Sequence, residues 1–428
     1  MKILLNSRSE ARFKAFLWHA LPRILRLISG LLAGVVVARH LGPQDFGALS
    51  FATMVAFWAA GLVQIGSLEV VTRNSAVCPE TMEPLLRTIT RLRLLGAISA
   101  AGLILLLNGW FWPGYRAMYA ILALFPLTCV PDCVEAAFFG RSEFRAIAPL
   151  RVVTSLLGLG LRLWLAASGF GPEAFALATV VEGGCTALLF LLYRKRIPDL
   201  SKDGKPPPIT PLLRQSLPIM ASGLVVGFMM KMDQLLLQSL RPSIDLGYYY
   251  VVVRFFDTVG VLIPSFVASV LPDLARLQNT RADEYRKKMI LIYRRSYQLG
   301  FLVALLSCLV APWAVPIVFG AQYKPAVPVF MAYSFVFPSL VVGSVRAMEF
   351  VISNKNINHL LVSLALLPLQ LGFCVAGIHW FGPMGLAAAM AVVGFISTTL
   401  FSLILPPLRE SGAIQKKALG SLLRWGKD

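Results

Sequence analysis

The chain has 428 residues and contains a series of uninterrupted apolar runs, each about 20 residues long. At about 1.5 Å per residue, a helix of this length crosses the roughly 30 Å hydrocarbon core of a bilayer. A membrane barrel strand would instead alternate polar and apolar residues over about 10 positions. Only 14% of the residues are charged, against roughly 25% in soluble domains. The runs therefore predict an all-α polytopic membrane protein.

The apolar runs define twelve predicted transmembrane helices. They cover residues 15–39, 46–70, 92–112, 116–139, 145–167, 172–193, 215–240, 247–271, 296–319, 326–351, 357–380 and 384–406. The N-terminal stretch does not resemble a cleavable signal peptide, because polar residues from Asn6 to Arg12 interrupt any short apolar core and no small-residue cleavage site follows. We therefore expect the first helix to remain in the mature protein.

The basic residues predict the orientation of these helices. The chain has 40 Lys and Arg against 21 Asp and Glu, and the odd-numbered predicted loops hold only Arg116, Arg241 and Lys324. Cytoplasmic loops of membrane proteins carry the excess of Lys and Arg. Both termini and the even-numbered loops are therefore predicted to face the cytoplasm. The same rule accounts for the basic surplus, so the charge does not indicate a nucleic-acid partner.

One long polar linker divides the predicted helices into six and six. It contains the stretch RKRIPDLSKDGKPPPITP at 194–211, and no other loop is as long and rich in proline. We expect an N-terminal bundle over 1–193, a cytoplasmic linker over 194–214 and a C-terminal bundle over 215–428. The sequence contains no Walker A, Rossmann or Gly-x-Ser-x-Gly motif, and its His and Cys residues lack metal-ligand spacing. We therefore expect no cofactor, no metal and no enzymatic activity.

Two short motifs recur in the two halves of the chain. Asp45-Phe46-Gly47 follows the first predicted helix, and Asp245-Leu246-Gly247 follows the seventh. Phe170-Gly171-Pro172 and Phe381-Gly382-Pro383 likewise precede the sixth and twelfth helices. Because six helices separate the copies, the halves have the same orientation and should be related by an axis along the membrane normal. The repeats predict two pseudo-symmetric six-helix bundles around a central cavity, with each Asp-x-Gly as a helix-terminating turn.

The stretch VVVARHLGPQDFGALSF around the first repeat resembles the signature of the polysaccharide-transporter family. MDQLLLQSLRPSIDLGYYYV, at 232–251, is similar to the segment that opens the second half of this family. The family contains the Wzx-type O-antigen and exopolysaccharide flippases, and it lies in the superfamily of multidrug, oligosaccharidyl-lipid and polysaccharide exporters. Twelve helices suit these sugar-lipid flippases, whereas lipid II flippases typically have fourteen.

The resemblance implies a substrate, a membrane and a set of partners. The substrate would be an undecaprenyl-diphosphate-linked oligosaccharide, moved across the bacterial inner membrane for the synthesis of surface polysaccharide. Membrane lipid would surround the protein, and a polysaccharide polymerase and chain-length machinery are the implied protein partners. The sequence itself names neither the sugars nor the energy source.

Charged residues inside the predicted helices are candidates for the transport site, because each costs roughly 2.5–3.5 kcal/mol to insert. Five are cations that we expect to line a cationic cavity for the diphosphate: Arg23, Arg26, Arg162, Lys231 and Arg254. Three are carboxylates that we take as candidates for ion coupling: Glu182, Asp233 and Asp257. For each of them, pairing between or within helices that merely stabilises the bundle is the alternative. Arg23 and Arg26 have no acidic residue within one helical turn.

Other functions are compatible with parts of this pattern. A cation-coupled multidrug exporter of the same superfamily would share the fold, but exporters of cationic drugs need an acidic cavity, whereas this one is basic. A membrane glycosyltransferase or polymerase would need paired carboxylates in its outer loops, and those loops are short. The tyrosines of GYYYVVVRFF, at 247–256, suit either stacking on sugar rings or an aromatic belt at the membrane interface.

Overall fold

The computed structural model describes most of the chain as helices, and no described residue lies in a strand. The described residues are 7–64, 67–77, 82–111, 113–141, 143–194, 214, 227–260, 263, 270–271, 274–278, 280–353, 356–404 and 408–421. Among them, eight helices are long and apolar enough to cross a membrane. Two of the eight, with 38 and 40 residues, bend at a glycine and are long enough to cross twice. The predicted all-α polytopic fold is therefore confirmed.

The chain forms two compact units. Unit 1 comprises Met1–Leu41 and Ala48–Lys231, and unit 2 comprises Gly42–Gly47 and Met232–Asp428. The main boundary lies near the middle of the chain, as a duplication requires. The six residues 42–47 are an exception, because they belong to unit 2 although they follow the first helix of unit 1. The linker predicted over 194–214 lies outside the described residues except at its two ends.

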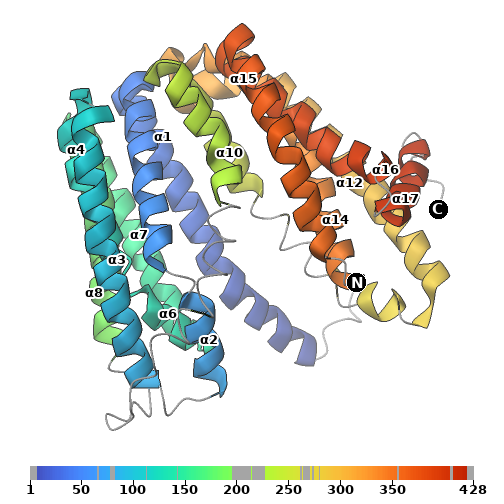
Figure 1. Ribbon diagram of the computed structural model, residues 1–428, viewed down its shortest axis with the longest axis horizontal. Helices are drawn as coiled ribbons and strands as arrows, with labels where there is room; N and C mark the ends of the chain where they lie inside the picture. The colour runs from blue at the N-terminus through green and yellow to red at the C-terminus, as the bar shows by residue number, and fades with distance from the viewer. Residues whose placement is uncertain are drawn as a thin grey trace. The chain divides into compact units, whose positions relative to one another are not determined.

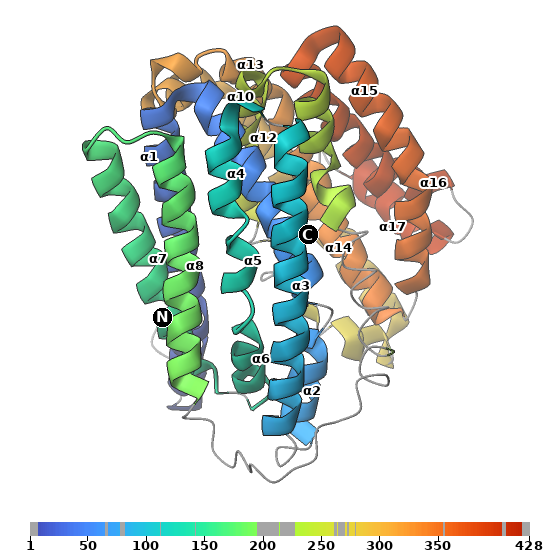
Figure 2. The same cartoon turned by 60° about the vertical axis from the view of Figure 1, so that its left-hand side comes forward.

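Unit 1 is a bundle of long helices that lie roughly side by side (Figures 1 and 2). Its elements are α1 (Ser7–Gln64, except for the six residues of unit 2), α2 (Ser67–Val77), α3 (Met82–Phe111), a 3-10 turn (Pro113–Tyr115), α4 (Arg116–Leu122), α5 (Phe125–Thr128), α6 (Asp132–Gly140), α7 (Phe144–Ala167) and α8 (Pro172–Arg194). Helix α7 packs on α8, and α2 packs on α6.

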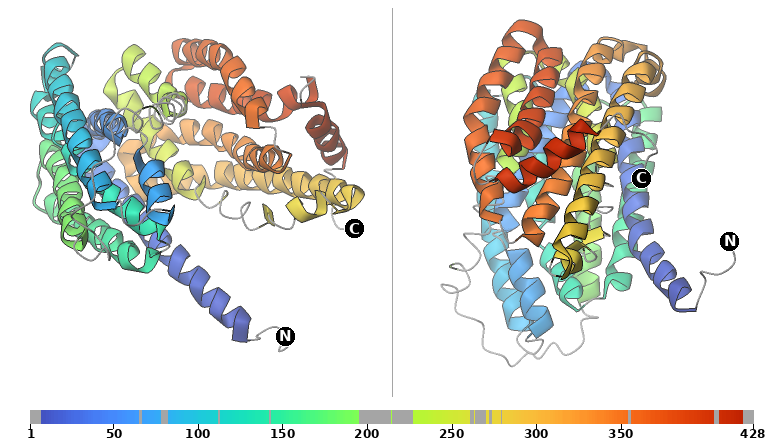
Figure 3. Two further views of the ribbon diagram at one scale, coloured as in Figure 1. Left: turned by 60° about the horizontal axis from the view of Figure 1, so that its bottom comes forward. Right: turned by 90° about the vertical axis from the view of Figure 1, so that its right-hand side faces the viewer.

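Unit 2 repeats this plan. Residues 227–240 are helical, and those from Met232 onward belong to this unit. The elements that follow are α10 (Ser243–Gly260), α12 (Ala282–Phe319), a 3-10 turn (Ala321–Tyr323), α13 (Ala326–Ser334), α14 (Val336–Ile352), α15 (Asn356–Phe395), a π-helix (Ile396–Leu400), α16 (Phe401–Ile404) and α17 (Arg409–Gly420). Long α12 packs on α13 and α14, as Figure 3 shows.

Glycines with positive φ end one predicted crossing and begin the next. Gly42 in α1 has a φ of 77°, and Gly382 in α15 has a φ of 58°. Glycine adopts this left-handed region without steric cost. Pro43 and Pro383 come directly after them, and proline suits the first turn of a helix because its φ is fixed and its missing N–H is not needed there. The Gly-Pro pairs therefore terminate and restart the helices.

The prediction that Asp-x-Gly terminates a helix is wrong. Asp45 lies in the first turn after Pro43, and Asp245 lies in the first turn of α10. A carboxylate at this position is favourable because it faces the positive end of the helix dipole. Gly47 and Gly247 are helical and do not have positive φ. Their role is therefore not to reverse the chain.

The predicted fourth and tenth crossings are both interrupted near their middle. The fourth consists of α4, α5 and α6, separated by turns at 123–124 and 129–131, and the tenth consists of α13 and α14, separated at Phe335. Pro126 and Pro131 contribute to the first set of breaks, because proline removes a backbone donor. Breaks in equivalent positions of the two halves support the duplication.

Helices α3 and α12 extend further than their apolar runs. We predicted the two crossings to begin at residues 92 and 296, whereas the helices begin at Met82 and Ala282. With 38 residues, α12 is about 57 Å long at about 1.5 Å per residue. Once a helix has formed, extending it by a turn that contains charged residues costs little. Hydropathy alone therefore underestimates the length of these two helices.

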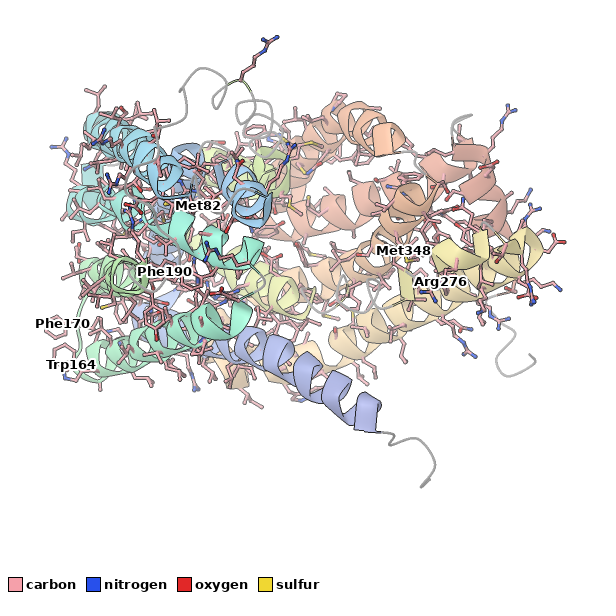
Figure 4. The ribbon with its side chains drawn as sticks, turned by 90° about the horizontal axis from the view of Figure 1, so that it is seen from below. Met82, Trp164, Phe170, Phe190, Arg276 and Met348 are labelled. Atoms are coloured by element: carbon pink, nitrogen blue, oxygen red, sulfur yellow. The ribbon has the colours of Figure 1, made fainter. Side chains whose placement is uncertain are left out.

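Each unit has a buried apolar cluster at the end that is predicted to face the cytoplasm, which we call the inner end. In unit 1 the core there includes Met82, Leu86 and Phe190. In unit 2 it includes Tyr293 and Met348, and Ile414 of α17 contributes to it. Figure 4 labels Met82, Phe190 and Met348 among the side chains. Elsewhere many leucines are exposed, as expected for helices that face lipid.

Candidate functional site

The two arginines predicted on the first helix lie on α1. The side chain of Arg23 is outside the described part of the structure. Arg26 is exposed, and its carbonyl accepts a 3.0 Å hydrogen bond from the hydroxyl of Ser29. Exposed Ile24 and Leu25 precede it directly. Arg26 is therefore an exposed cation beside exposed apolar residues of this helix.

Arg162 and Glu182, predicted for different roles, form an ion pair between α7 and α8. Nη1 of Arg162 lies 2.6 Å from Oε2 of Glu182 and also donates to the carbonyl of Gly158 at 3.0 Å. Its Nη2 donates to the hydroxyl of Thr179 at 3.2 Å. Both charged side chains are partly buried. A predicted phosphate-binding residue and a predicted ion-coupling residue thus lie at one site, where they pair with each other.

The remaining predicted residues lie on two consecutive helical segments. Asp233 is buried, with 2% exposure, and accepts a 2.6 Å hydrogen bond from the hydroxyl of Tyr249 on α10. The Tyr249 ring meets the ring of Tyr333 edge-on at 5.8 Å, which places Asp233 in an aromatic environment. Tyr249 thus supplies a hydrogen bond to this buried carboxylate.

The other three predicted charges are less enclosed. Lys231 ends unit 1 and is half-buried, and Arg254 of α10 is also half-buried. Asp257 lies one turn after Arg254 on the same helix and is exposed. The helical spacing brings this acid and base to one face of α10.

Sequence reasoning missed Arg93, which is completely buried in unit 1. Its Nε donates to the hydroxyl of Ser67 at 2.8 Å, and its Nη1 lies 3.4 Å from the carbonyls of Cys129 and Val130. These carbonyls belong to the break between α5 and α6. Arg93 thus donates to backbone carbonyls of the interrupted helix, while its own Nη2 has no hydrogen-bond partner. Unwound segments of this kind are typical of transporter substrate sites.

A second, half-buried arginine of unit 1 connects α6 and α7. Nε of Arg151 donates to Glu135 at 3.0 Å, and its Nη2 contacts both Glu135 and, at 3.4 Å, Asp132. The guanidinium carbon lies 5.0 Å from the centre of the Phe190 ring. Both acids therefore form ion pairs with Arg151. Arg151 is therefore occupied by protein groups.

In unit 2, a buried polar network holds the C-terminal helix α17. Glu349 of α14, 5% exposed, accepts hydrogen bonds from the hydroxyls of Tyr293 at 2.5 Å and Ser411 at 2.7 Å. Gln415 of α17 donates to Ser402 at 3.2 Å. Figure 1 shows α17 beside α12 and α16.

Arg346 of α14 belongs to the same region but has different partners. Its Nη1 donates to the carbonyl of Ser397, within the π-helix, and lies 3.4 Å from the hydroxyl of Ser402. A π-helical turn shifts the backbone hydrogen bonds by one residue, so that carbonyls become available to side chains. Arg346 and Glu349 are thus both buried in polar contacts.

The aromatic residues at the opposite end of unit 1 fit a membrane interface. Trp164 and Phe170 are exposed with ring centres 5.8 Å apart, and Figure 4 shows them together at one edge of this unit. Rings of this kind settle at the level of lipid headgroups. For the described aromatic residues of GYYYVVVRFF the structure is mixed, because Tyr249 is buried whereas Tyr248 and Tyr250 are half-buried.

Comparison with known proteins places these features in a family. The family model described as "Polysaccharide biosynthesis protein" matches residues 36–328, which is more than half of the chain. None of the curated proteins matches the sequence.

Solved structures share the fold at low sequence identity. An inward-facing multidrug resistance MATE family transporter of the MOP superfamily is 17% identical, with a TM-score of 0.69, and 95% of this chain and 99% of that chain are covered. The lipid II flippase MurJ in an inward closed conformation is 15% identical, with a TM-score of 0.66 and coverage of 96% and 94%. The Vibrio cholerae MATE transporter VcmN in its bent form is 16% identical, with a TM-score of 0.56 and coverage of 95% and 97%. The chain therefore belongs to the polysaccharide biosynthesis protein family and has the fold of the MOP-superfamily transporters and flippases.

Proposed function

We propose that the protein moves an undecaprenyl-diphosphate-linked oligosaccharide from the cytoplasmic to the periplasmic leaflet of the inner membrane, by alternating access. The observation that carries this proposal is the family match over 36–328 in a chain with the fold of transporters and flippases. A membrane transporter that serves polysaccharide biosynthesis needs a precursor as its cargo. A lipid-linked oligosaccharide is such a precursor, and it is built on one side of the membrane and used on the other.

The headgroup sets the physical problem that the protein has to solve. Sugars and a diphosphate cannot enter hydrocarbon without partners, because buried polar groups and charges without hydrogen bonds are costly. We propose that Arg23 and Arg26 of α1 bind the diphosphate, since guanidinium groups bind phosphate oxygens through two parallel hydrogen bonds. The exposed position of Arg26 on an apolar turn supports this role. Lys231 and Arg254 are the corresponding candidates in the second half of the chain.

We further propose that the pair of Arg162 and Glu182 couples transport to an ion gradient. The 2.6 Å contact ties the guanidinium to the carboxylate. A proton taken up by Glu182 from the periplasm would break this pair, and its release to the cytoplasm would restore the pair before the next substrate binds. Asp233 and Asp257 are further candidate sites for a coupling ion. In this scheme the proton and the substrate are carried alternately and in opposite directions, as export driven by an inward gradient requires.

The orientation is part of the same proposal. Both termini and the linker 194–214 should face the cytoplasm, and the polymerase and chain-length machinery should receive the product on the other side. A tag inserted at Lys205 should react with membrane-impermeant reagents only after the inner membrane is opened. Labelling of this tag from the periplasm in intact cells would refute the orientation.

A reconstitution experiment tests the substrate. Proteoliposomes containing the protein and a labelled prenyl-diphosphate oligosaccharide should transfer the label between leaflets. Arg26→Gln should reduce the rate about tenfold, because one charge-assisted hydrogen bond contributes roughly 1.5–3 kcal/mol. Arg26→Lys should recover part of the rate, since it keeps the charge but loses the fork. Lys287→Gln, which changes an exposed cation near the inner end of α12, is the matched control and should leave the rate unchanged.

The second candidate function, a cation-coupled exporter of small molecules, predicts a different outcome. Such a protein would move a cationic dye across the same vesicles and would not move the lipid-linked sugar. Arg26→Gln would then increase or preserve transport, because it removes a positive charge from the path of a cation.

A further inference from the structure

Unit 2 contains an apolar groove on the side of α12 that the candidate transport site does not include. Its volume is about 250 Å³, and α10, α12 and α13 each contribute to its walls. The residues of α12 that line it run from Leu306 to Phe319, the last residue of this helix. At about 1.5 Å per residue, this stretch covers about 20 Å. The groove therefore lies along the half of α12 that is farther from the inner end.

The lining of the groove excludes a sugar and suits a hydrocarbon chain. Of the described residues that line it, Ser307 alone has a polar side chain. The hydroxyl groups of a sugar would lose their hydrogen bonds to water there, which is costly. Pockets that enclose a drug-sized ligand have volumes of roughly 300–1,000 Å³. The groove is smaller than this, so it fits a segment of a chain rather than a whole lipid.

One side of the groove is open to the surrounding membrane. Leu306, Val310 and Val318 line it and are exposed, whereas Ala311 and Val315 of the same helix line it and are buried. A chain can therefore enter sideways from the bilayer. The acyl chains of ordinary phospholipids have the same access, so the occupant has to be argued from the walls and from the charge beside them.

Aromatic rings form one wall of the groove. Phe255 of α10 and Phe330 of α13 both line it, and their ring centres lie 5.3 Å apart. Buried Phe256 packs on Phe330, with 5.1 Å between ring centres. An isoprenoid chain carries a methyl branch and a double bond in each unit. It therefore offers more atoms to such a wall than a straight chain does, and it has fewer conformations to lose on binding.

A cation lies directly beside this wall. Arg254 precedes Phe255 on α10, so that their Cα atoms are about 3.8 Å apart, and it is half-buried. In a prenyl diphosphate, the diphosphate is bonded to the first isoprene unit, so the negative charge stands at the start of the chain. A phospholipid carries its phosphate at the membrane surface, whereas Arg254 lies about 17 Å along α10 from Ser243, where this helix begins. The cation and the groove together match a prenyl diphosphate.

We infer that the groove is a subsite for the first isoprene units of the lipid-linked substrate while its diphosphate is at Arg254. This inference rests on the proposed function, because it takes a prenyl diphosphate as the cargo. It gives the apolar tail a site of its own on the flank of unit 2 during transport. The competing occupant is the acyl chain of a membrane phospholipid.

Photolabelling tests the occupant directly. The photoreactive residue benzoylphenylalanine would replace Val310, at the exposed rim of the groove, or Leu309, which is exposed on the same helix and does not line the groove. Phosphatidylglycerol proteoliposomes with a trace of tritiated undecaprenyl diphosphate would then be illuminated. We expect about fivefold more label at Val310 than at Leu309. Equal labelling of the two positions would overturn the inference. So would an equally strong preference of tritiated phosphatidylglycerol for Val310.

A charge variant tests whether the diphosphate directs the chain into the groove. In the Val310 photolabelling protein, Arg254→Gln should lower labelling by undecaprenyl diphosphate about threefold or more. It should not change labelling by tritiated undecaprenol, which has the same chain without the diphosphate. Lys287→Gln, the exposed control on α12, should change neither. The same loss with both probes, or a loss with neither, would overturn the inference.

Filling the groove tests its use in transport. Ala314→Phe places a ring in the groove and should lower transfer of labelled prenyl-diphosphate oligosaccharide about tenfold, whereas Leu309→Phe on the exposed side should stay within about twofold. Normal transfer by Ala314→Phe would overturn the inference, and the labelling experiments decide if this variant does not accumulate. Selective labelling of Val310 in a protein that transfers no oligosaccharide would contradict the proposed function and leave the groove supported. Transfer without selective labelling would do the reverse.

Discussion

The polar network under α17 allows a quantitative test of how the C-terminal helix is held. Tyr293 and Ser411 both donate to one oxygen of Glu349, and all three side chains are buried. A hydrogen bond to a charged group contributes roughly 1.5–3 kcal/mol net. Tyr293→Phe removes one such bond without changing the shape of the ring. Glu349→Gln keeps the shape of the acceptor but removes its charge.

A double-mutant cycle separates this interaction from the rest of the packing. We expect Tyr293→Phe and Glu349→Gln each to lower the free energy of unfolding. Their coupling should be about 1–1.5 kcal/mol, the difference between a charge-assisted and a neutral hydrogen bond, because glutamine still accepts from Tyr293. The measurement is unfolding of the purified protein in mixed micelles with increasing dodecyl sulfate, followed by circular dichroism. Ser344→Ala is the matched control on α14, because that exposed hydroxyl bonds only within its own helix, at 2.9 Å to Leu340, and its loss should cost less than about 0.5 kcal/mol.

The reasoning would fail if the coupling between Tyr293 and Glu349 were below about 0.5 kcal/mol while both single variants were destabilised. That result would mean that α17 is held by its apolar residues, such as Ile414 and Ala418, and that the carboxylate is a bystander. A coupling in the expected range would establish that a buried polar contact anchors the C-terminal helix to the membrane bundle.

Three other predictions follow from contacts in the membrane. In vesicles with an imposed proton gradient, Glu182→Gln should uncouple transport from the gradient. The double variant of Glu182→Gln with Arg162→Gln should be more stable to dodecyl sulfate than either single variant, because each single change leaves a charge without its partner. Gly47→Ala should lower transport at least tenfold, since its methyl group would meet a backbone oxygen, and Gly61→Ala, where the structure has open space, should not. Arg93→Met should unfold at a higher dodecyl sulfate concentration than Arg93→Lys, because lysine keeps a buried charge without the donor fork that reaches three acceptors.

The fold could be predicted from the sequence, because helices that face lipid must be apolar and because the two halves repeat the same motifs. The recurrent Asp-x-Gly motif correctly indicated two related halves. Its local structure was predicted wrongly, since a glycine between apolar residues can either reverse the chain or admit another backbone, and only the contact of Gly47 with Ser243 shows which.

The site was less predictable than the fold, because it depends on which helices meet. Arg93 was overlooked because hydropathy placed the start of its helix at residue 92, and a charge at the end of a helix is unremarkable, whereas the helix actually begins at Met82. The pairing of Arg162 with Glu182 joins two helices whose rotation about their axes the sequence does not determine.

The sequence of the C-terminal helix contains a weak indication that this helix docks on the membrane bundle. The buried face of α17 consists of Ser411, Gly412, Ile414, Gln415 and Ala418. Apart from Ile414 these residues are small or polar, so hydropathy gives the segment the character of a soluble tail. A pattern of small residues next to a membrane domain is a better indicator of docking than apolar periodicity in such a helix.

The placement of residues 42–47 in unit 2 also has a consequence for how the protein is made. Gly47 leaves the ribosome 200 residues before Gly247, which it contacts at the start of α10. At a synthesis rate of roughly 5–20 residues per second, this interval lasts about 10–40 s. During that time the first six membrane helices are inserted, while residues 42–47 have no α10 to receive them. The N-terminal half must therefore wait in the membrane with one segment undocked until the eighth helix arrives.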